Sequence, residues 1–143
     1  MAEYMARLEL PADAAEEARL CVPVPTTPAR RRQRGYNQAE LLARAYARLT
    51  GRRLALLLER APGGGSQTAL QPIARRANVA GAFRVSAGAA TSLLDAHLLL
   101  VDDVLTTGAT ATECAATLAA AGARCITLVT FARALDARRL TRS

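Results

Sequence analysis

The sequence contains no lysine and no tryptophan, only five aromatic residues (three Tyr and two Phe) and one histidine, His97. Because lysine is absent, the chain cannot carry the GK[ST] loop with which P-loop proteins bind nucleotide phosphates. One histidine alone cannot form a metal site. Cys21, Cys114 and Cys125 occur singly, without a CxxC pair. We therefore expect three small buried thiols in a reducing compartment rather than zinc ligands or disulfides.

The sequence also lacks the apolar run of roughly 20 residues that a membrane-spanning helix requires. Its first 20 residues are mixed and charged, unlike a signal peptide. We therefore expect a cytoplasmic protein that does not insert into a membrane. A length of 143 residues, of which 51% are hydrophobic, predicts one folded domain over 1–143 and excludes a disordered chain.

All 19 cationic residues are arginine, and the net charge is +7. A genome rich in G and C is the simplest explanation, but arginine also binds phosphate through a bidentate fork. The run of Arg30, Arg31, Arg32 and Arg34 is interpreted as a solvated or pyrophosphate-adjacent cluster, or as a surface that follows a nucleic-acid backbone. No aromatic residues interleave with the run, so a stacking platform for single strands is not indicated.

Hydrophobic periodicity and turn residues predict alternating strands and helices. The expected helices are 5–19 (interrupted by Pro11), 37–50 and 110–121, and the expected strands are 20–24, 54–58, 79–85, 98–101 and 125–131. The helix-start pairs are Asn37 with Glu40 and Thr110 with Glu113, and the helix ends are Gly51 and Gly122. Residues 86–92 are expected as a loop.

The order of these elements predicts an α/β fold with an open, mostly parallel sheet and flanking helices. The strands are continuous apolar runs, which is typical of strands covered on both faces. The segment 62–78, PGGGSQTALQPIARRAN, is the least regular part of the chain. Proline followed by three glycines is costly to order without a partner, so the segment is a floppy connection or a functional lid.

Residues 98–110 read LLLVDDVLTTGAT, an apolar strand that ends in two adjacent carboxylates. Asp102 and Asp103 repel each other, so they need hydroxyl donors or a cation. A turn rich in threonine and glycine follows and leads into a helix, whose unpaired first N–H groups form an anion site. Because ligands bind beyond the carboxyl ends of parallel strands, this spacing fits a ribose 5-phosphate. The simpler alternative is a capping turn after two surface aspartates.

The same segment resembles the phosphoribosyl pyrophosphate (PRPP) signature of type I phosphoribosyltransferases: four hydrophobic residues, two acids and a phosphate loop. Further segments resemble the ComF (competence protein F) family, and the resemblance covers about 22–133. These segments are PVP at 23–25, RGYNQAELLA at 34–43, Ser66-Gln67, Arg75 with Asn78, and GAF at 81–83.

The resemblance implies a role for each matching position. Asp102 and Asp103 would hold the ribose hydroxyls of PRPP, with Mg²⁺ bound through the pyrophosphate and those hydroxyls. The 5-phosphate would be wrapped by the residues Thr106, Thr107, Gly108, Ala109 and Thr110. The loop at 25–28 would approach the pyrophosphate, and 62–78 would be the lid. The implied pyrophosphate and lid residues are Thr26, Thr27, Arg34, Gln67 and Arg75, and the implied catalytic residues are Asp102, Asp103 and Arg75.

Two departures from the family pattern restrict this interpretation. The four-cysteine zinc module that many ComF members carry at the N-terminus is missing, and residues 1–20 or the C-terminal tail would form the acceptor-binding hood. Purine-salvage relatives carry an aspartate base where this chain has Thr106, and a threonine hydroxyl is not a general base near neutral pH.

Three functions remain open: a phosphoribosyltransferase with an unidentified acceptor, a non-catalytic nucleotide-sensing module of the DNA-uptake machinery, and a DNA-binding adaptor. The expected ligand is PRPP or a nucleotide containing ribose 5-phosphate. Relatives commonly dimerise, so a homodimer is a candidate state.

Overall fold

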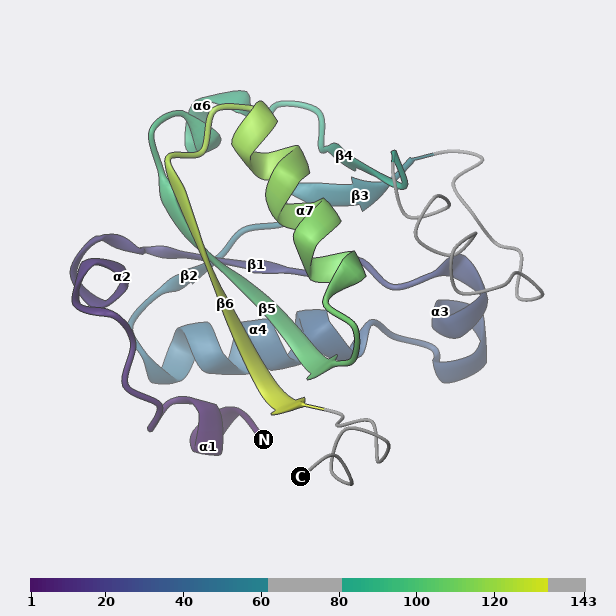
Figure 1. The fold of residues 1–143 in the computed structure, drawn as a ribbon. Helices are drawn as coiled ribbons and strands as arrows, with labels where there is room; N and C mark the ends of the chain where they lie inside the picture. Colours follow the sequence, from purple (N-terminus) through teal and green to yellow (C-terminus); the bar gives the residue numbers. More distant parts are fainter. Residues whose placement is uncertain (62–80, 134–143) are drawn as a thin grey trace, which may run out of the picture.

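The main sheet of the computed structural model, which describes residues 1–61 and 81–133, has four strands in the order β2-β1-β5-β6 (Figure 1). All three strand pairings are parallel. The strands are β1 (Leu20–Pro23), β2 (Arg53–Leu54), β5 (His97–Leu105) and β6 (Cys125–Arg133). A separate antiparallel ribbon pairs β3 (Leu58–Arg60) with β4 (Phe83–Val85).

Both faces of the sheet are covered, and β5 shows why. Leu98 and Leu100 pack into one buried cluster, whereas Leu99 and Val101 pack into the other. Each of these side chains is at most 1% exposed, and burying one contributes about 1.5–3 kcal/mol. The continuous apolar run therefore fills two cores, and the predicted open α/β fold is confirmed.

The two faces are covered by different elements (Figure 1). Residues of α1 (Ala2–Met5), α2 (Ala12–Glu17) and α4 (Gln38–Leu49) lie in the cluster of Leu99. The opposite cluster receives residues of α7 (Ala109–Ala120), α6 (Ala90–Leu93) and the β3–β4 ribbon. The result is a three-layer arrangement with the sheet in the middle.

The chain leaves the two central strands in opposite directions. From β1 it passes through α3 (Pro28–Arg34) and α4 to β2 on one side, and from β5 it passes through α7 to β6 on the other. Because β1 and β5 are parallel neighbours, the loops that follow them separate at adjacent carboxyl ends. Such a switch point leaves the crevice in which open α/β sheets bind ligands.

Helix α4 begins and ends nearly as predicted. The Asn37 side chain accepts a hydrogen bond from the Ala39 N–H at 3.1 Å, and Gly51 has the left-handed φ of +70°. Glu40 does not complete a capping pair, because its carboxylate accepts from the Arg44 guanidinium at 3.2 Å instead.

The predicted Thr110–Glu113 capping pair of α7 is wrong. The helix starts one residue earlier, behind Gly108, whose φ of +82° lets the chain turn sharply. Glu113 instead accepts a hydrogen bond from the Gly81 N–H at 3.0 Å, which ties the start of the described β4 segment to α7. Gly122, with φ of +115°, follows the end of the helix as expected.

Four other predictions need correction. The apolar run 54–58 is not one strand: it is divided between β2 and β3, and Leu56 between them is 53% exposed. The predicted helix 5–19 is two short helices, α1 and α2. Of the predicted strand 79–85, only 83–85 forms β4 among the described residues, and α6 lies within the predicted loop 86–92.

A fifth difference is helix α3, for which the sequence gives no prediction. It begins behind Thr27, whose hydroxyl accepts from the Arg30 N–H at 3.1 Å, has Pro28 in its first turn, and ends at Gly35 with φ of +76°. The arginine run at 30–34 is therefore helical, so its side chains point in different directions around one helix.

Burial raises the pKa of Cys21 to about 11 and that of Cys114 to about 12, so both are protonated thiols in the core. Cys125 is only partly buried. In the described part of the chain, no helix has both the length and the apolar character needed to cross a membrane.

Candidate functional site

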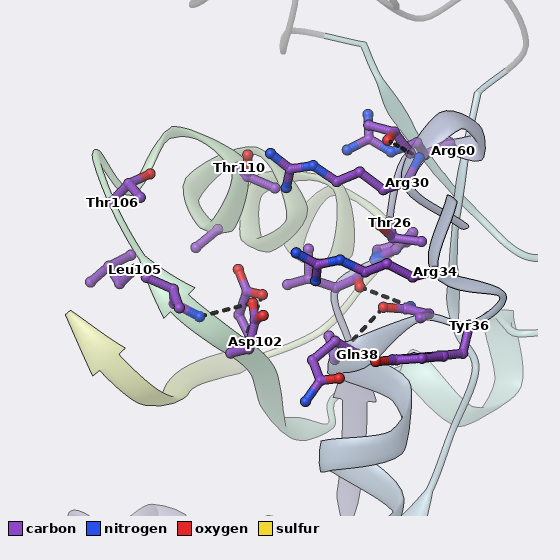
Figure 2. A pocket seen from close by; sticks show the side chains of 18 of the residues that line it. Thr26, Arg30, Arg34, Tyr36, Gln38, Arg60, Asp102, Leu105, Thr106 and Thr110 are labelled. Atoms are coloured by element: carbon purple, nitrogen blue, oxygen red, sulfur yellow. Dashed lines mark hydrogen bonds between the residues drawn. The ribbon is translucent and has the colours of Figure 1, made fainter. Parts of the chain in front are cut away.

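A cavity of about 460 Å³ opens at the carboxyl ends of β1 and β5 (Figure 2). Four parts of the chain contribute to its wall: the loop after β1, the cavity-facing side of α3 with the start of α4, the end of β3, and the segment from the end of β5 into α7. The sheet thus positions an acidic pair, a helix start and several guanidinium groups around one space.

Asp102 and Asp103 form the acidic side of the cavity. They lie within β5, which continues to Leu105 rather than ending at the acids. The Asp103 N–H donates to Asp102 Oδ1 at 2.9 Å, and the Val104 N–H donates to Asp103 Oδ1 at 2.9 Å.

The charge of Asp102 is not fully neutralised by the protein. Burial, and after it a hydrogen bond from the Asp103 side chain, raises the pKa of Asp102 from 3.8 to about 7, although the Asp103 N–H and Arg30 oppose the rise. A cation, or hydroxyl donors placed beside the pair, would relieve this cost. The acidic pair therefore favours the binding of a ligand that carries positive charge or hydroxyl groups.

The start of α7 forms the second side. Thr106, Gly108, Thr110 and Ala111 line the cavity. The N-cap of this helix is Gly108, which has no side chain, and the Thr107 hydroxyl accepts only from the first N–H, that of Ala109. The next N–H groups of this 12-residue helix and its positive dipole end are therefore presented to an anion.

Three arginines form the third side. Arg30 and Arg34 are four residues apart on α3, so they share one face of the helix, and Figure 2 shows their side chains extending across the cavity toward Asp102 and Thr110. Arg60 adds a guanidinium from the end of β3. Among the described lining residues, three guanidinium groups face two carboxylates, which favours an anionic ligand.

Arg60 is the most constrained of the three. Its guanidinium carbon lies 4.8 Å from the ring centre of Phe83, and its Nε is buried without a hydrogen-bond partner in the described part of the chain. Burial lowers its pKa, Cys114 opposes the shift, and the Arg30 guanidinium adds to it. A bound phosphate would satisfy the unpaired N–H and separate the two like charges.

The structure brings most of the predicted site residues into this cavity. The lining includes Asp102, Asp103, Thr106, Gly108, Thr110, Thr26, Thr27 and Arg34. Thr107 and Ala109 do not line it: the Thr107 hydroxyl accepts from the Ala109 N–H at 3.3 Å, so these two shape the turn. Gln67 and Arg75 lie outside the described residues, and their roles stay predictions.

Sequence reasoning missed two contributions. The sequence analysis places Arg30 only in the arginine run. Thr27 and Pro28 together are a helix-start signal, and a helix beginning there puts Arg30 and Arg34 on one face of that helix. Arg60 carried no signal, because the run before it was read as a single strand. It reaches the cavity only through the β3–β4 ribbon.

The N-terminal 20 residues, predicted as a hood, lie mainly beside α4 on one face of the sheet. Their described link to the cavity is between Gln38 Nε2 and Met1 Sδ, 3.7 Å apart. A role of this segment in acceptor binding stays a prediction.

The sheet, the acidic pair and the uncapped helix together define a protein of the type I phosphoribosyltransferase fold. The family model of the phosphoribosyl transferase domain matches residues 37–142, nearly three quarters of the sequence. The chain therefore belongs to the phosphoribosyl transferase domain family.

The solved structure of an allosteric regulatory enzyme of purine biosynthesis is similar in fold, with a TM-score of 0.59 and 21% sequence identity. The likeness covers 90% of this chain and 24% of the chain of that enzyme. Among curated protein sequences, none is similar enough to this one to count as a match.

Proposed function

We propose that this protein binds PRPP together with Mg²⁺ and transfers its phosphoribosyl group to an acceptor, with release of pyrophosphate. One observation carries the proposal: the acidic pair, the start of α7 and the guanidinium groups line the same cavity. In this arrangement Asp102 and Asp103 accept hydrogen bonds from the ribose hydroxyls. The N–H groups and hydroxyls of Thr106, Gly108 and Thr110, which line the cavity, bind the 5-phosphate.

The arginines fit the opposite end of the substrate. Arg30, Arg34 and Arg60 face the cavity from the side of the loop at 25–28, so they are placed to bind the pyrophosphate. Negative charge on the pyrophosphate grows as the bond to the ribose breaks. Preorganised guanidinium groups stabilise that charge more than the charge of the bound substrate, which is how they would accelerate the reaction.

The chemistry of the site fits Mg²⁺. Burial leaves the charge of Asp102 poorly compensated, and a Mg²⁺ ion brought in by the substrate phosphates would compensate it. When bound, the ion would neutralise charge on the pyrophosphate, while Asp102 and Asp103 orient the ribose hydroxyls that complete its coordination.

The acceptor is restricted by what the cavity offers. Among the described lining residues, the only carboxylates are Asp102 and Asp103, and Thr106 stands where purine-salvage relatives have their base. The proposal therefore concerns acceptors that need no deprotonation by a residue at 106. The same observation favours a second candidate, a module that binds PRPP without transferring it.

We further propose that the protein is a ComF relative. Two of the ComF-like segments meet in the structure, because the Asn37 side chain donates to the Val24 carbonyl at 3.2 Å while it also caps α4. Asn37 belongs to RGYNQAELLA and Val24 to PVP, so one contact joins both. A place in DNA uptake, cytoplasmic location and homodimer formation are implied by that relationship and remain part of the proposal.

The first test is binding. Calorimetric titration of the protein with PRPP and Mg²⁺ should show saturable binding, and ligand at a hundredfold excess over Kd should add about 2.7 kcal/mol to the free energy of unfolding. The double variant Asp102→Asn/Asp103→Asn should lose this response, whereas Glu16→Gln on α2, which does not line the cavity, should keep it. No response of the unchanged protein at millimolar PRPP would refute the ligand assignment.

The second test is turnover. Pyrophosphate release is measured with a panel of amines and nucleobases. Release that requires both PRPP and one acceptor supports the transferase, whereas tight PRPP binding without release supports the non-catalytic module. Salt-dependent DNA binding that survives the double variant would support the adaptor instead.

A further inference from the structure

A second cluster of reactive side chains lies at the opposite end of the sheet from the cavity. His97 and Cys125 are the first residues of β5 and β6, and they pair directly in the parallel register. Asp13 approaches them from α2. One ligand atom from each of the three, a ring nitrogen, a sulfur and a carboxylate oxygen, lies within 4.8 Å of the others. Asp102 lies five positions after His97 along β5, which is about 16 Å at the usual rise of a strand.

His97 has polar groups at both ends of its ring, although it is only 4% exposed. Its Nε2 lies 2.8 Å from the Thr127 hydroxyl. Its Nδ1 is buried without a hydrogen-bond partner in the described residues, and the nearest carboxylate oxygen, Glu17 Oε2, is 3.6 Å away. An unsatisfied buried polar atom costs about 1–3 kcal/mol, so we expect the ring proton on Nδ1, where it faces the Glu17 carboxylate, which leaves the lone pair of Nε2 free to bind a ligand.

We propose that His97, Cys125 and Asp13 bind a Zn²⁺ ion, with a water molecule as fourth ligand. Imidazole, thiolate and carboxylate are the donors that zinc uses in proteins, whereas Mg²⁺ and Ca²⁺ prefer oxygen alone. Two anionic ligands and a neutral imidazole balance the charge of the ion. Binding releases the thiol proton of Cys125 to solvent.

The geometry requires a small adjustment. Zinc bonds of 2.0–2.3 Å in a tetrahedron separate the donor atoms by about 3.3–3.8 Å. The donors must therefore approach one another by at most about 1–1.5 Å, and the exposed side chain of Asp13 is free to make most of this movement.

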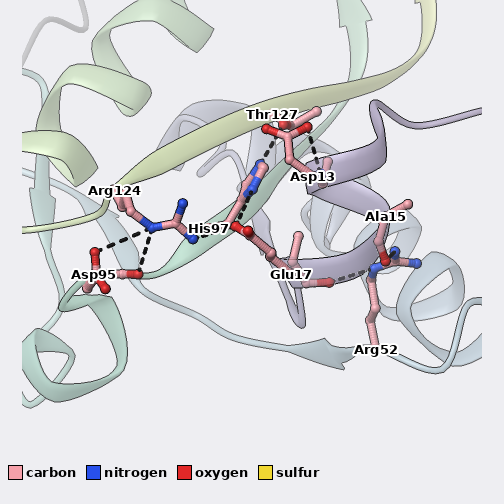
Figure 3. A network of polar contacts seen from close by, with 10 residues as sticks. Asp13, Ala15, Glu17, Arg52, Asp95, His97, Arg124 and Thr127 are labelled. Carbon is pink, nitrogen blue, oxygen red and sulfur yellow. Dashed lines mark hydrogen bonds and ion pairs between the residues drawn. The ribbon is translucent and has the colours of Figure 1, made fainter.

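The surroundings of the ring match a zinc-binding histidine. Figure 3 shows Thr127 and Asp13 at one end of the imidazole and Glu17 at the other. If Nε2 binds the metal, Nδ1–H faces Glu17, which is the carboxylate–histidine–zinc arrangement that orients the ring. Glu17 is itself held by an ion pair with Arg124. The ion would fasten α2 to the first residues of β5 and β6.

The experiment uses the full chain without an affinity tag, prepared free of metal. Zn²⁺ affinity is measured by competition with a chromophoric chelator, and Co²⁺ is substituted as a spectroscopic probe. We expect one ion per chain, a rise in Tm with Zn²⁺, and a sulfur-to-cobalt charge-transfer band with the absorption of a tetrahedral site.

The variants separate the ligands from their surroundings. Asp13→Asn and Cys125→Ser should each weaken Zn²⁺ binding more than about 100-fold, and Cys125→Ser should abolish the charge-transfer band. Glu17→Gln should weaken binding about 10- to 100-fold. Glu16→Gln, on the same helix, should leave it unchanged, as should Asp102→Asn/Asp103→Asn at the distant cavity.

Because Asp13 is exposed and Cys125 is partly exposed, both variants should fold, which a circular dichroism spectrum of the metal-free protein checks. The proposal is overturned if cobalt gives no charge-transfer band, or if Asp13→Asn and Cys125→Ser retain the affinity of the unchanged protein. Either outcome would leave His97 as a histidine held only by its contacts with Thr127 and Glu17. Neither outcome bears on PRPP binding.

Discussion

Replacing Asp102 by asparagine should stabilise the ligand-free protein and at the same time weaken PRPP binding. In the folded protein burial, followed by a hydrogen bond from the Asp103 side chain, raises the pKa of Asp102 from 3.8 to about 7. The folded-state pKa lies above the unfolded-state value. At pH values between the two, Asp102 therefore keeps a proton in the folded protein that it loses in the unfolded protein. The stability it contributes is therefore full below about pH 4, is lost as the pH rises toward 7, and stays lost above that.

A pKa rise of about three units corresponds to at most ~4 kcal/mol. Asp102 is only partly buried and Arg30 lies nearby, so solvent and this cation reduce the effect, and we expect about 1–2 kcal/mol. Asparagine has nearly the same shape, and its amide oxygen can still accept from the Asp103 N–H. The substitution therefore removes the charge and keeps the hydrogen bond.

The assay is thermal unfolding of Asp102→Asn and the unchanged protein, without ligand, at pH values from about 4.5 to 8.5. At the alkaline end the Tm of the variant should be higher by about 3–8 °C, and the difference should shrink toward the acidic end. Glu16→Gln should show no such pH-dependent gain. A lower Tm of the variant at pH 8, or an equal gain at every pH, would refute the reasoning.

Three further substitutions test other parts of the site. Gly108→Ala forces a Cβ onto a backbone with φ of +82°, so we expect a loss of about 1 kcal/mol in thermal unfolding, and an unchanged Tm would contradict it. Asn37→Ala removes one helix cap and one hydrogen bond to Val24, the residue after β1, so urea unfolding should show a loss of about 1–2 kcal/mol, and an unmoved midpoint would count against both contacts. Arg30→Ala should raise the calorimetric Kd for PRPP at least about tenfold. The control Arg32→Ala, on the same helix but outside the cavity lining, should change the Kd less than about twofold. Equal losses of affinity would mean that only the overall positive charge of α3 contributes to binding.

The acidic pair and the helix start could be predicted from sequence because they are contiguous. Asp102 to Thr110 form one short segment, so the order strand, acids, turn and helix is visible without knowing any distant contact. The apolar run before Asp102 also has no alternation, which correctly indicated a strand buried on both faces.

The parts that failed depend on distant contacts or on very short elements. Residues 54–58 are uniformly apolar, and only the pairing of Leu54 with Cys21 and of Leu58 with Val85 divides them between two sheets. Helix α3 has no buried residue, so hydrophobic periodicity could not reveal it. Arg60 became part of the site only through that same unpredicted division.

The β3–β4 ribbon has a consequence for how this chain can vary. The Ala61 N–H donates to the Ala82 carbonyl at 2.8 Å, so the residues on either side of 62–80 are joined by the ribbon itself. The two ends of the intervening segment are therefore held together by the ribbon, and the entropy of closing the segment costs only about 0.6 kcal/mol more for each doubling of its length. Natural variation in the length of that segment should therefore cost the described scaffold little closure entropy.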